Sequence, residues 1–68
     1  MKAVSGKRLC SVLEEHGWVL QRIHGSHHIY ARTGNPMILT VPVHGNRDLK
    51  RGLLRQLMRD AELTEDDL

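Results

Sequence analysis

Aromatic residues and cysteines are scarce in this sequence. Trp18 and Tyr30 are its two aromatic side chains and phenylalanine is absent, so the core has to be built from Leu, Val, Ile and Met. Cys10 has no second cysteine to pair with, which excludes an internal disulfide and a cysteine-based zinc ribbon and indicates a reducing compartment. No segment reaches the ~18 apolar residues of a membrane span, and no apolar run follows the first residues as in a signal peptide. These absences predict a cytoplasmic protein without membrane association.

Length sets a second limit. The chain has 68 residues, which predicts one small domain over residues 1–68. A domain of this size buries only about 60% of the surface that its unfolded chain exposes. A deep, enclosed pocket is therefore not expected, whereas a shallow surface site, or a site shared with a partner, is.

The formal net charge of +2 hides a strong segregation of charge. Residues 1–59 hold all ten Lys and Arg side chains and three acidic ones, a net of +7, while residues 60–68 hold five acidic side chains and no basic one. A basic body favours a polyanionic partner such as a nucleic acid, although a solvated basic surface has the same composition. Residues 62–68 are predicted to be an acidic tail that frays. Thr64 and Asp67 have the spacing of a weak capping pair, but too little chain follows for a stable helix.

Two segments carry the apolar spacing of amphipathic helices. The first runs from Gly6 to His16, with Ser5 as its N-cap and a glycine after its last turn. The second lies within residues 49–61 and has a basic outer face. Gly52 interrupts its apolar spacing, which indicates that the regular helix starts near that glycine.

Three segments between the helices are rich in strand-forming residues and are separated by turn residues. They are residues 18–23, 27–32 and 37–41. Connections this short make the strands antiparallel neighbours, because parallel neighbours need a crossover of about a dozen residues. The order α-β-β-β-α predicts a two-layer α+β fold, in which a three-stranded antiparallel sheet carries both helices on one face and leaves the other open. This is the layout of double-stranded RNA-binding domains.

Histidines are concentrated around the start of the second strand. Of five in the chain, His24, His27 and His28 stand close together. With His44 they could offer imidazoles to a metal, but the basic body supplies no carboxylate near them, so neither a metal nor another cofactor is predicted. An alternative is that these histidines are ordinary exposed side chains on a polar strand and have no functional role.

Two residues could act as nucleophiles in covalent catalysis, and neither is favoured. Cys10 lies inside the first helix near Glu14 and Glu15, where a thiolate is not stabilised and a small buried side chain is expected. Ser26 is adjacent to His27 in the sequence, but this does not place a base at its hydroxyl, and a turn residue is expected there. The remaining reading is RNA cleavage, in which the substrate's own 2′-hydroxyl attacks the phosphate and a histidine moves protons. Such a reaction needs no cofactor and no deep pocket.

Several segments together resemble the HicA family of toxin ribonucleases, in order and at normal spacing. They are SGKR (residues 5–8), LEEHGW (13–18), GSHH (25–28), VPVH (41–44) and LKRGLLRQL (49–57). The resemblance implies a fold like that of double-stranded RNA-binding domains, cleavage of messenger RNA, and neutralisation by a HicB antitoxin that binds over the active region. It implies that the catalytic residue is the histidine directly after Gly-Ser, which is His27. Binding to DNA is expected only through the antitoxin.

Strand alternation favours a different histidine for the catalytic role. Ile29 and Ala31 are predicted to face the core, which would expose His28 rather than His27. His44 could assist proton transfer, but a loop-capping role is favoured for it.

The alternatives to a nuclease are a non-catalytic RNA-binding module of the same fold and a domain that only binds a partner protein. The residues expected to contact RNA are Lys7, Arg8, Arg22, Gly25, Ser26, His28, Tyr30, Lys50, Arg51 and Arg55.

Overall fold

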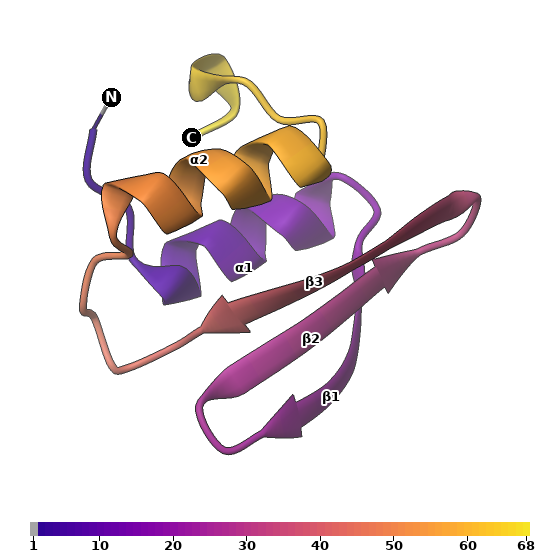
Figure 1. Ribbon diagram of the computed structural model, residues 1–68, viewed down its shortest axis with the longest axis horizontal. Coiled ribbons are helices and arrows are strands. Elements are labelled where there is room, and N and C mark those ends of the chain that lie inside the picture. The colour runs from indigo at the N-terminus through magenta and orange to yellow at the C-terminus, as the bar shows by residue number, and fades with distance from the viewer. Residues whose placement is uncertain (1) are drawn as a thin grey trace.

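The computed structural model describes residues 2–68, in which two helices pack on one face of a three-stranded sheet (Figure 1). The predicted order α-β-β-β-α and the α+β fold are confirmed. The elements are α1 (Gly6–Glu15), β1 (Val19–His24), β2 (His27–Arg32), β3 (Asn35–Pro42), α2 (Arg51–Asp60) and a single 3-10 turn, η1 (Glu65–Asp67). Within residues 2–68, neither helix is long or apolar enough to span a membrane.

Helix α1 begins and ends where its capping residues predict. The Ser5 Oγ accepts a hydrogen bond from the backbone N–H of Arg8 at 3.0 Å. At the other end Gly17 takes a φ of 89°, and the N–H groups of Gly17 and Trp18 bond back to carbonyl oxygens of the last turn. This termination turns the Trp18 side chain into the core, where it is 1% exposed.

The sheet has the order β1-β2-β3, and both strand pairs are antiparallel. Strand β2 covers the residues predicted for it, and β1 is shifted by one residue because Trp18 belongs to the helix end. Strand β3 is longer than predicted, since it includes Pro36 and Pro42. A proline removes a backbone donor, and β3 accommodates both because it is an edge strand.

The helices cover the face of the sheet that carries Tyr30, not the face predicted from the strand pattern. Tyr30 pairs with Leu39 across the β2–β3 ladder, and both side chains are 1% exposed. Ile29 lies on the opposite face, where it is 8% exposed, and it is not part of the core cluster. The prediction that Ile29 and Ala31 face the core is therefore wrong, because the tyrosine finds a partner for its hydroxyl on α1 and is buried with it. The core cluster also includes Leu9, Val12, Leu13, Val41, Leu54, Leu57 and Met58.

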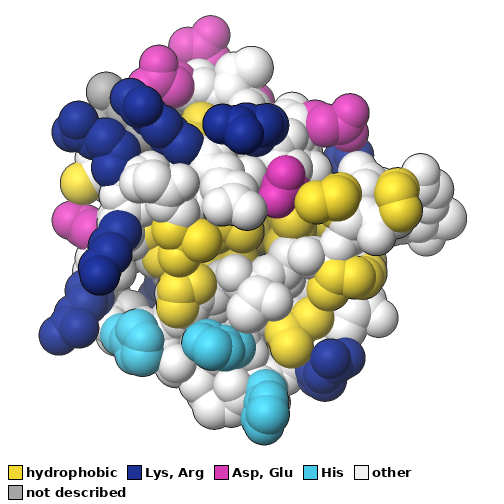
Figure 2. Space-filling model, viewed as in Figure 1, with side chains coloured by type: hydrophobic (Ala, Val, Ile, Leu, Met, Phe, Trp, Pro, Cys, Tyr) yellow, Lys and Arg dark blue, Asp and Glu magenta, His cyan; other side chains and the backbone are white. Residues whose placement is uncertain are grey.

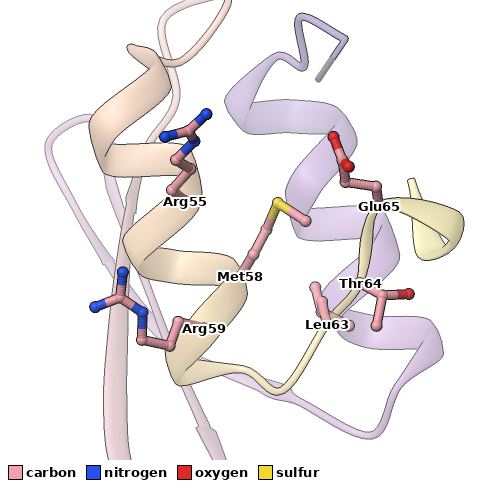
Figure 3. Close-up of a pocket in the computed structure, with 6 residues that line it drawn as sticks. All are labelled: Arg55, Met58, Arg59, Leu63, Thr64 and Glu65. Atoms are coloured by element: carbon pink, nitrogen blue, oxygen red, sulfur yellow. The ribbon is translucent and has the colours of Figure 1, made fainter.

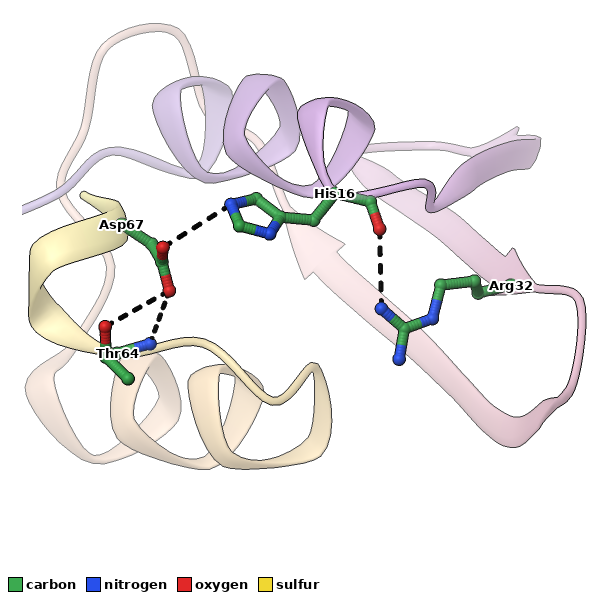
Figure 4. Close-up of polar contacts among 4 residues, drawn as sticks. All are labelled: His16, Arg32, Thr64 and Asp67. Atoms are coloured by element: carbon green, nitrogen blue, oxygen red, sulfur yellow. Dashed lines mark hydrogen bonds and ion pairs between the residues drawn. The ribbon is translucent and has the colours of Figure 1, made fainter.

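The acidic tail packs against the rest of the molecule instead of fraying. Leu63 is buried, and its backbone N–H bonds to the carbonyl of Met58 at the end of α2. One oxygen of Asp67 accepts hydrogen bonds from the N–H and the hydroxyl of Thr64, at 2.7 and 3.2 Å. Its other oxygen lies 3.6 Å from Nε2 of His16, the residue directly after α1 (Figure 4). The spacing of Thr64 and Asp67 thus marks a capping pair, as predicted, but on a 3-10 turn that the buried Leu63 holds in place.

Candidate active site

The histidine-rich segment forms the hairpin between β1 and β2. His24 and His27 are its last paired residues, and Gly25 and Ser26 make the turn. Gly25 has a φ of 63°, which glycine adopts readily at the first central position of a type II′ turn. Apart from its chain neighbours, no atom lies within 4 Å of the position that a Cβ on Gly25 would take. The surface beside the turn is therefore open to a ligand.

His27 and His28 lie on opposite faces of β2. His27 pairs with His24 on one side and with Pro42 on the other, and it is exposed on the face away from the helices. His28 lies on the helix-facing side and is half-buried. Because Tyr30 marks the core face, alternation exposes His27 rather than His28, contrary to the expectation from the sequence pattern.

The end of β3 brings a fourth histidine, His44, to the hairpin. The backbone N–H of Val43 donates to the carbonyl of Ser26 at 2.8 Å, and Nε2 of His44 lies 3.5 Å from the Ser26 Oγ. Figure 2 shows histidine side chains gathered at one end of the molecule, with apolar side chains next to them. The loop-capping role expected for His44 stays a prediction, and the fold places its ring beside the side chain of Ser26 in the hairpin turn.

The first turn of α1 is docked against the same end of β3. A Cβ added to Gly6 would lie 2.1 Å from the carbonyl oxygen of Pro42, so this approach requires glycine. Lys7 and Arg8 follow directly and are exposed. Two of the residues expected to bind phosphate therefore lie within one helical turn of the docking point.

The remaining basic residues do not converge on one spot. Arg22 is exposed on β1, two residues before His24, and Lys50 lines a pocket that His44 also lines. Arg51 and Arg55 line two other pockets along α2. The predicted set of RNA contacts therefore divides into residues near the hairpin and residues directed away from it.

A pocket of about 520 Å³ lies between α2 and the tail. Figure 3 shows Arg55 and Arg59 on the helix side of this pocket and Leu63, Thr64 and Glu65 on the tail side. None of its lining residues belongs to the hairpin or to the end of β3. Size alone therefore does not identify the candidate site.

Tyr30 is not available to stack on a base, contrary to prediction. Its ring is buried, and its hydroxyl donates a hydrogen bond to Oε2 of Glu14 at 2.7 Å. Burial, reinforced by the hydrogen bond to Glu14, raises the pKa of Tyr30 far above its ordinary value. The phenol therefore stays protonated and links the central strand to α1.

Cys10 is a buried residue of α1, as expected from the sequence. Burial raises the pKa of its thiol, and the charge of Glu14 raises it further. A thiolate nucleophile is therefore disfavoured at this position. Among residues 2–68, no group of three or more His, Cys, Asp or Glu side chains is arranged to hold a metal ion.

Sequence reasoning missed Arg47 and Asp48, which line the pocket beside His44. They belong to the loop after β3, where the N–H of Arg47 bonds to the carbonyl of His44 at 3.0 Å. The one available signal was the position of this loop directly after the strand that pairs with the hairpin.

The comparison with protein families agrees with the resemblance read from the sequence. The family model described as the HicA toxin of bacterial toxin-antitoxin systems matches residues 6–63, from the start of α1 to just beyond α2. The match includes the hairpin turn and the end of β3. No curated protein matches the chain. The chain therefore belongs to the HicA toxin family.

Proposed function

We propose that this toxin is an endoribonuclease that cleaves messenger RNA and uses His27 to transfer protons. The observation that carries the proposal is the position of His27 in a HicA toxin: it is exposed, next to an open glycine turn. Histidine exchanges protons near neutral pH, which general acid–base catalysis requires. Members of the HicA family are generally known to cleave messenger RNA, which supports the same activity here.

The reaction is an attack of the 2′-hydroxyl on the neighbouring phosphorus. A bond forms between the 2′-oxygen and phosphorus while the bond to the 5′-oxygen breaks. His27 takes the proton of the 2′-hydroxyl or gives one to the leaving 5′-oxygen, and water exchanges the other proton. The product is a 2′,3′-cyclic phosphate, and the protein needs no resident metal or other cofactor for it.

Binding of the RNA backbone is assigned to the basic surface around the hairpin. Lys7, Arg8, Arg22 and Lys50 are exposed there, and Gly25 leaves room for a phosphate to approach the backbone. Ser26, in the turn next to His27, and His28, on the opposite face of β2, are also assigned to RNA contact. Arg51 and Arg55 of α2 bind phosphates further along the RNA chain, away from the hairpin.

The partner that controls this activity is a HicB-type antitoxin. An antitoxin that covers His27 would block the substrate and the proton transfer together. The toxin acts in the cytoplasm, where its substrate is, and contacts operator DNA only through the antitoxin.

Cleavage of a defined RNA by purified protein tests the proposal, with His27→Ala as the decisive variant. The matched control is His24→Ala, because His24 is directly opposite His27 on the same exposed face. His27→Ala should lower kcat/KM by about 10²–10⁴-fold, the usual contribution of general acid–base catalysis, whereas His24→Ala should stay close to wild type. Cleavage should persist in excess EDTA and leave a cyclic phosphate or its hydrolysis product.

Three results would contradict the proposal in different ways. A strict need for a divalent ion would exclude the metal-free mechanism. Loss of activity in His28→Ala but not in His27→Ala would move the catalytic role to His28. Salt-dependent RNA binding without any cleavage would leave a binding module of the same fold, and weak RNA affinity even at low salt would leave a domain that binds only protein.

A further inference from the structure

A second pocket, of about 270 Å³, opens beside His44 at the hairpin end of the molecule. We propose that it binds one base of the RNA, on a nucleotide next to the scissile phosphate. The inference rests on the proposed function, since it concerns how the same site recognises its substrate. It goes further because it assigns a base-binding subsite to a loop that carries none of the predicted site residues except Lys50.

The position of the pocket ties it to the catalytic hairpin. Pro42, one of its walls, is the residue directly opposite His27 in the β2–β3 ladder. His44, another wall, lies 3.5 Å from the Ser26 Oγ through its Nε2. A base held here would therefore bring its own sugar and phosphate to the end of β3. This end of β3 is paired with the start of β2, where His27 lies.

The walls are held in place by the fold and need no rearrangement to form. The backbone N–H of Leu49 donates to the carbonyl of Val4 at 2.8 Å, and Asp48 forms a β-bridge with Ser5. The close approach of Gly6 to Pro42 secures the opposite side. A preformed site saves the ordering of the loop that binding would otherwise require.

The chemistry of the walls suits a flat, largely apolar ring with polar edges. Pro42, Leu49 and Leu53 provide apolar surface, and Leu53 is only partly buried because it forms part of this wall. The volume is below the ~300–1,000 Å³ of pockets that enclose drug-sized ligands. The pocket therefore fits a single base rather than a longer stretch of RNA.

The charged side chains at the pocket favour a base over a free anion as its ligand. Arg47 and Lys50 are cations that can hold the phosphates on either side of the bound nucleotide. Asp48 also lines the pocket, and its carboxylate has no hydrogen bond or ion pair with any other side chain of residues 2–68. A carboxylate repels a phosphate placed inside the pocket but accepts a hydrogen bond from an exocyclic amino group of a base. The pocket should therefore prefer cytosine over uracil, which has no such amino group.

Nucleotide binding to full-length, ¹⁵N-labelled His27→Ala protein tests the inference. The probes are cytidine 5′-monophosphate, uridine 5′-monophosphate and ribose 5-phosphate, followed by amide chemical shifts. The cytidine nucleotide should shift the amides of His44, Leu49 and Leu53 in a saturable way and bind about 3- to 10-fold more tightly than the uridine nucleotide, as one additional hydrogen bond allows. Ribose 5-phosphate should cause no saturable shift at these residues.

Two matched variants assign the preference to Asp48. Asp48→Ala should bind both nucleotides equally, whereas Asp66→Ala, which removes an exposed carboxylate from the tail, should keep the preference for cytidine. Equal shifts with ribose 5-phosphate and with the cytidine nucleotide would overturn the proposal in favour of a simple phosphate site. Unmoved amides around the pocket would also overturn it, and would leave the pocket for an apolar side chain of a protein partner.

The outcomes separate this inference from the proposed function. Because binding is read in a protein without His27, base selectivity at the pocket can hold even if the wild type cleaves no RNA. Conversely, cleavage that depends on His27 without nucleotide binding at the pocket would remove the subsite and leave the nuclease.

Discussion

Histidine has different surroundings at the two ends of the molecule. At the hairpin end His24 and His27 are exposed, and neither side chain has a hydrogen bond or ion pair within residues 2–68. At the other end His16 follows the last turn of α1, and its ring lies 3.6 Å from Asp67 of the tail (Figure 4). A ring without a partner is available to a substrate, whereas a ring held by a carboxylate contributes to the fold.

The surroundings of arginine differ in the same way. Arg32 lies over the ring of Trp18, 4.8 Å from its centre, and pairs with Glu62 of the tail. It also donates to the carbonyl of His16 at 3.4 Å. Arg22, on the exposed edge strand, makes no such contacts within residues 2–68. Charge alone therefore does not identify an RNA-binding residue.

The strongest test of this comparison makes the same substitution at both ends. His27→Ala should lower RNA cleavage by about 10²–10⁴-fold and leave the thermal unfolding midpoint unchanged. His16→Ala should do the reverse: cleavage stays near wild type, and stability falls by less than about 1 kcal/mol, as is usual for an exposed ion pair. Cleavage rates and melting curves of the two variants measure this directly. Equal loss of cleavage in both would show that the two ends do not differ in function.

Substitution of Gly6 should cause the largest loss of stability. A Cβ at this position would lie 2.1 Å from the Pro42 carbonyl oxygen, and a backbone oxygen cannot turn away as a side chain can. We expect Gly6→Ala to destabilise the fold by about 1–3 kcal/mol, the usual range for overpacking. Chemical denaturation measures the change.

Gly52 of α2 is the matched control for Gly6. No atom lies within 4 Å of the position that an added Cβ would take, and its φ is outside the left-handed range that favours glycine. Gly52→Ala should therefore stabilise the protein, by less than the ~1 kcal/mol of a helix interior because Gly52 is the second residue of α2. If both substitutions lowered stability or both raised it, the close approach of α1 to β3 would be contradicted.

A third pair of variants separates the two faces of the sheet. Tyr30→Phe removes the hydrogen bond to Glu14 on the helix-facing side and should cost about 1 kcal/mol of stability, with RNA affinity unchanged. Arg22→Ala, on the exposed edge strand, should leave stability unchanged and weaken RNA binding, with the dependence of log K on log salt reduced by about one. A loss of RNA affinity in Tyr30→Phe would show that the Tyr30 hydroxyl contacts RNA, which its burial and its hydrogen bond to Glu14 exclude.

The parts of the fold that were predicted correctly depend on local signals. Ser5 caps α1 and Gly17 ends it, and both act through bonds to residues within one turn. The end of α2 has no such signal, because Glu62, and not a glycine, takes the positive φ of 61° that turns the chain. That conformation is held by the buried Leu63 and by the ion pair of Glu62 with Arg32, a residue 30 positions away. Contacts of this kind cannot be read from the tail alone.

The same distinction applies to the candidate site. The hairpin segment was identified because Gly25, Ser26 and His27 are adjacent in sequence. His44 and Asp48 reach the site only through the pairing of β3 with β2 and the docking of the following loop on the N-terminal segment. Tyr30 was assigned to the wrong face because its partner Glu14 lies on another element.

The smallest expected effect concerns the pH dependence of the tail. Hydrogen bonds from Thr64 lower the pKa of Asp67 below the value of 3.8 expected for an unfolded chain, and the nearby His16 adds to this. A carboxyl with a lowered pKa in the folded state stabilises the fold above the unfolded pKa, and this contribution is lost as the pH falls through the folded value. The melting temperature should therefore drop between pH 5 and pH 3 by a little more in the wild type than in Asp67→Asn. Asp66→Asn is the control, because the Asp66 carboxylate makes no such hydrogen bond within residues 2–68, and it should follow the wild type. If Asp67→Asn retained the full pH dependence of the wild type, the carboxylate would not anchor the tail, and the contrast between a structural and a catalytic end would rest on Arg32 alone.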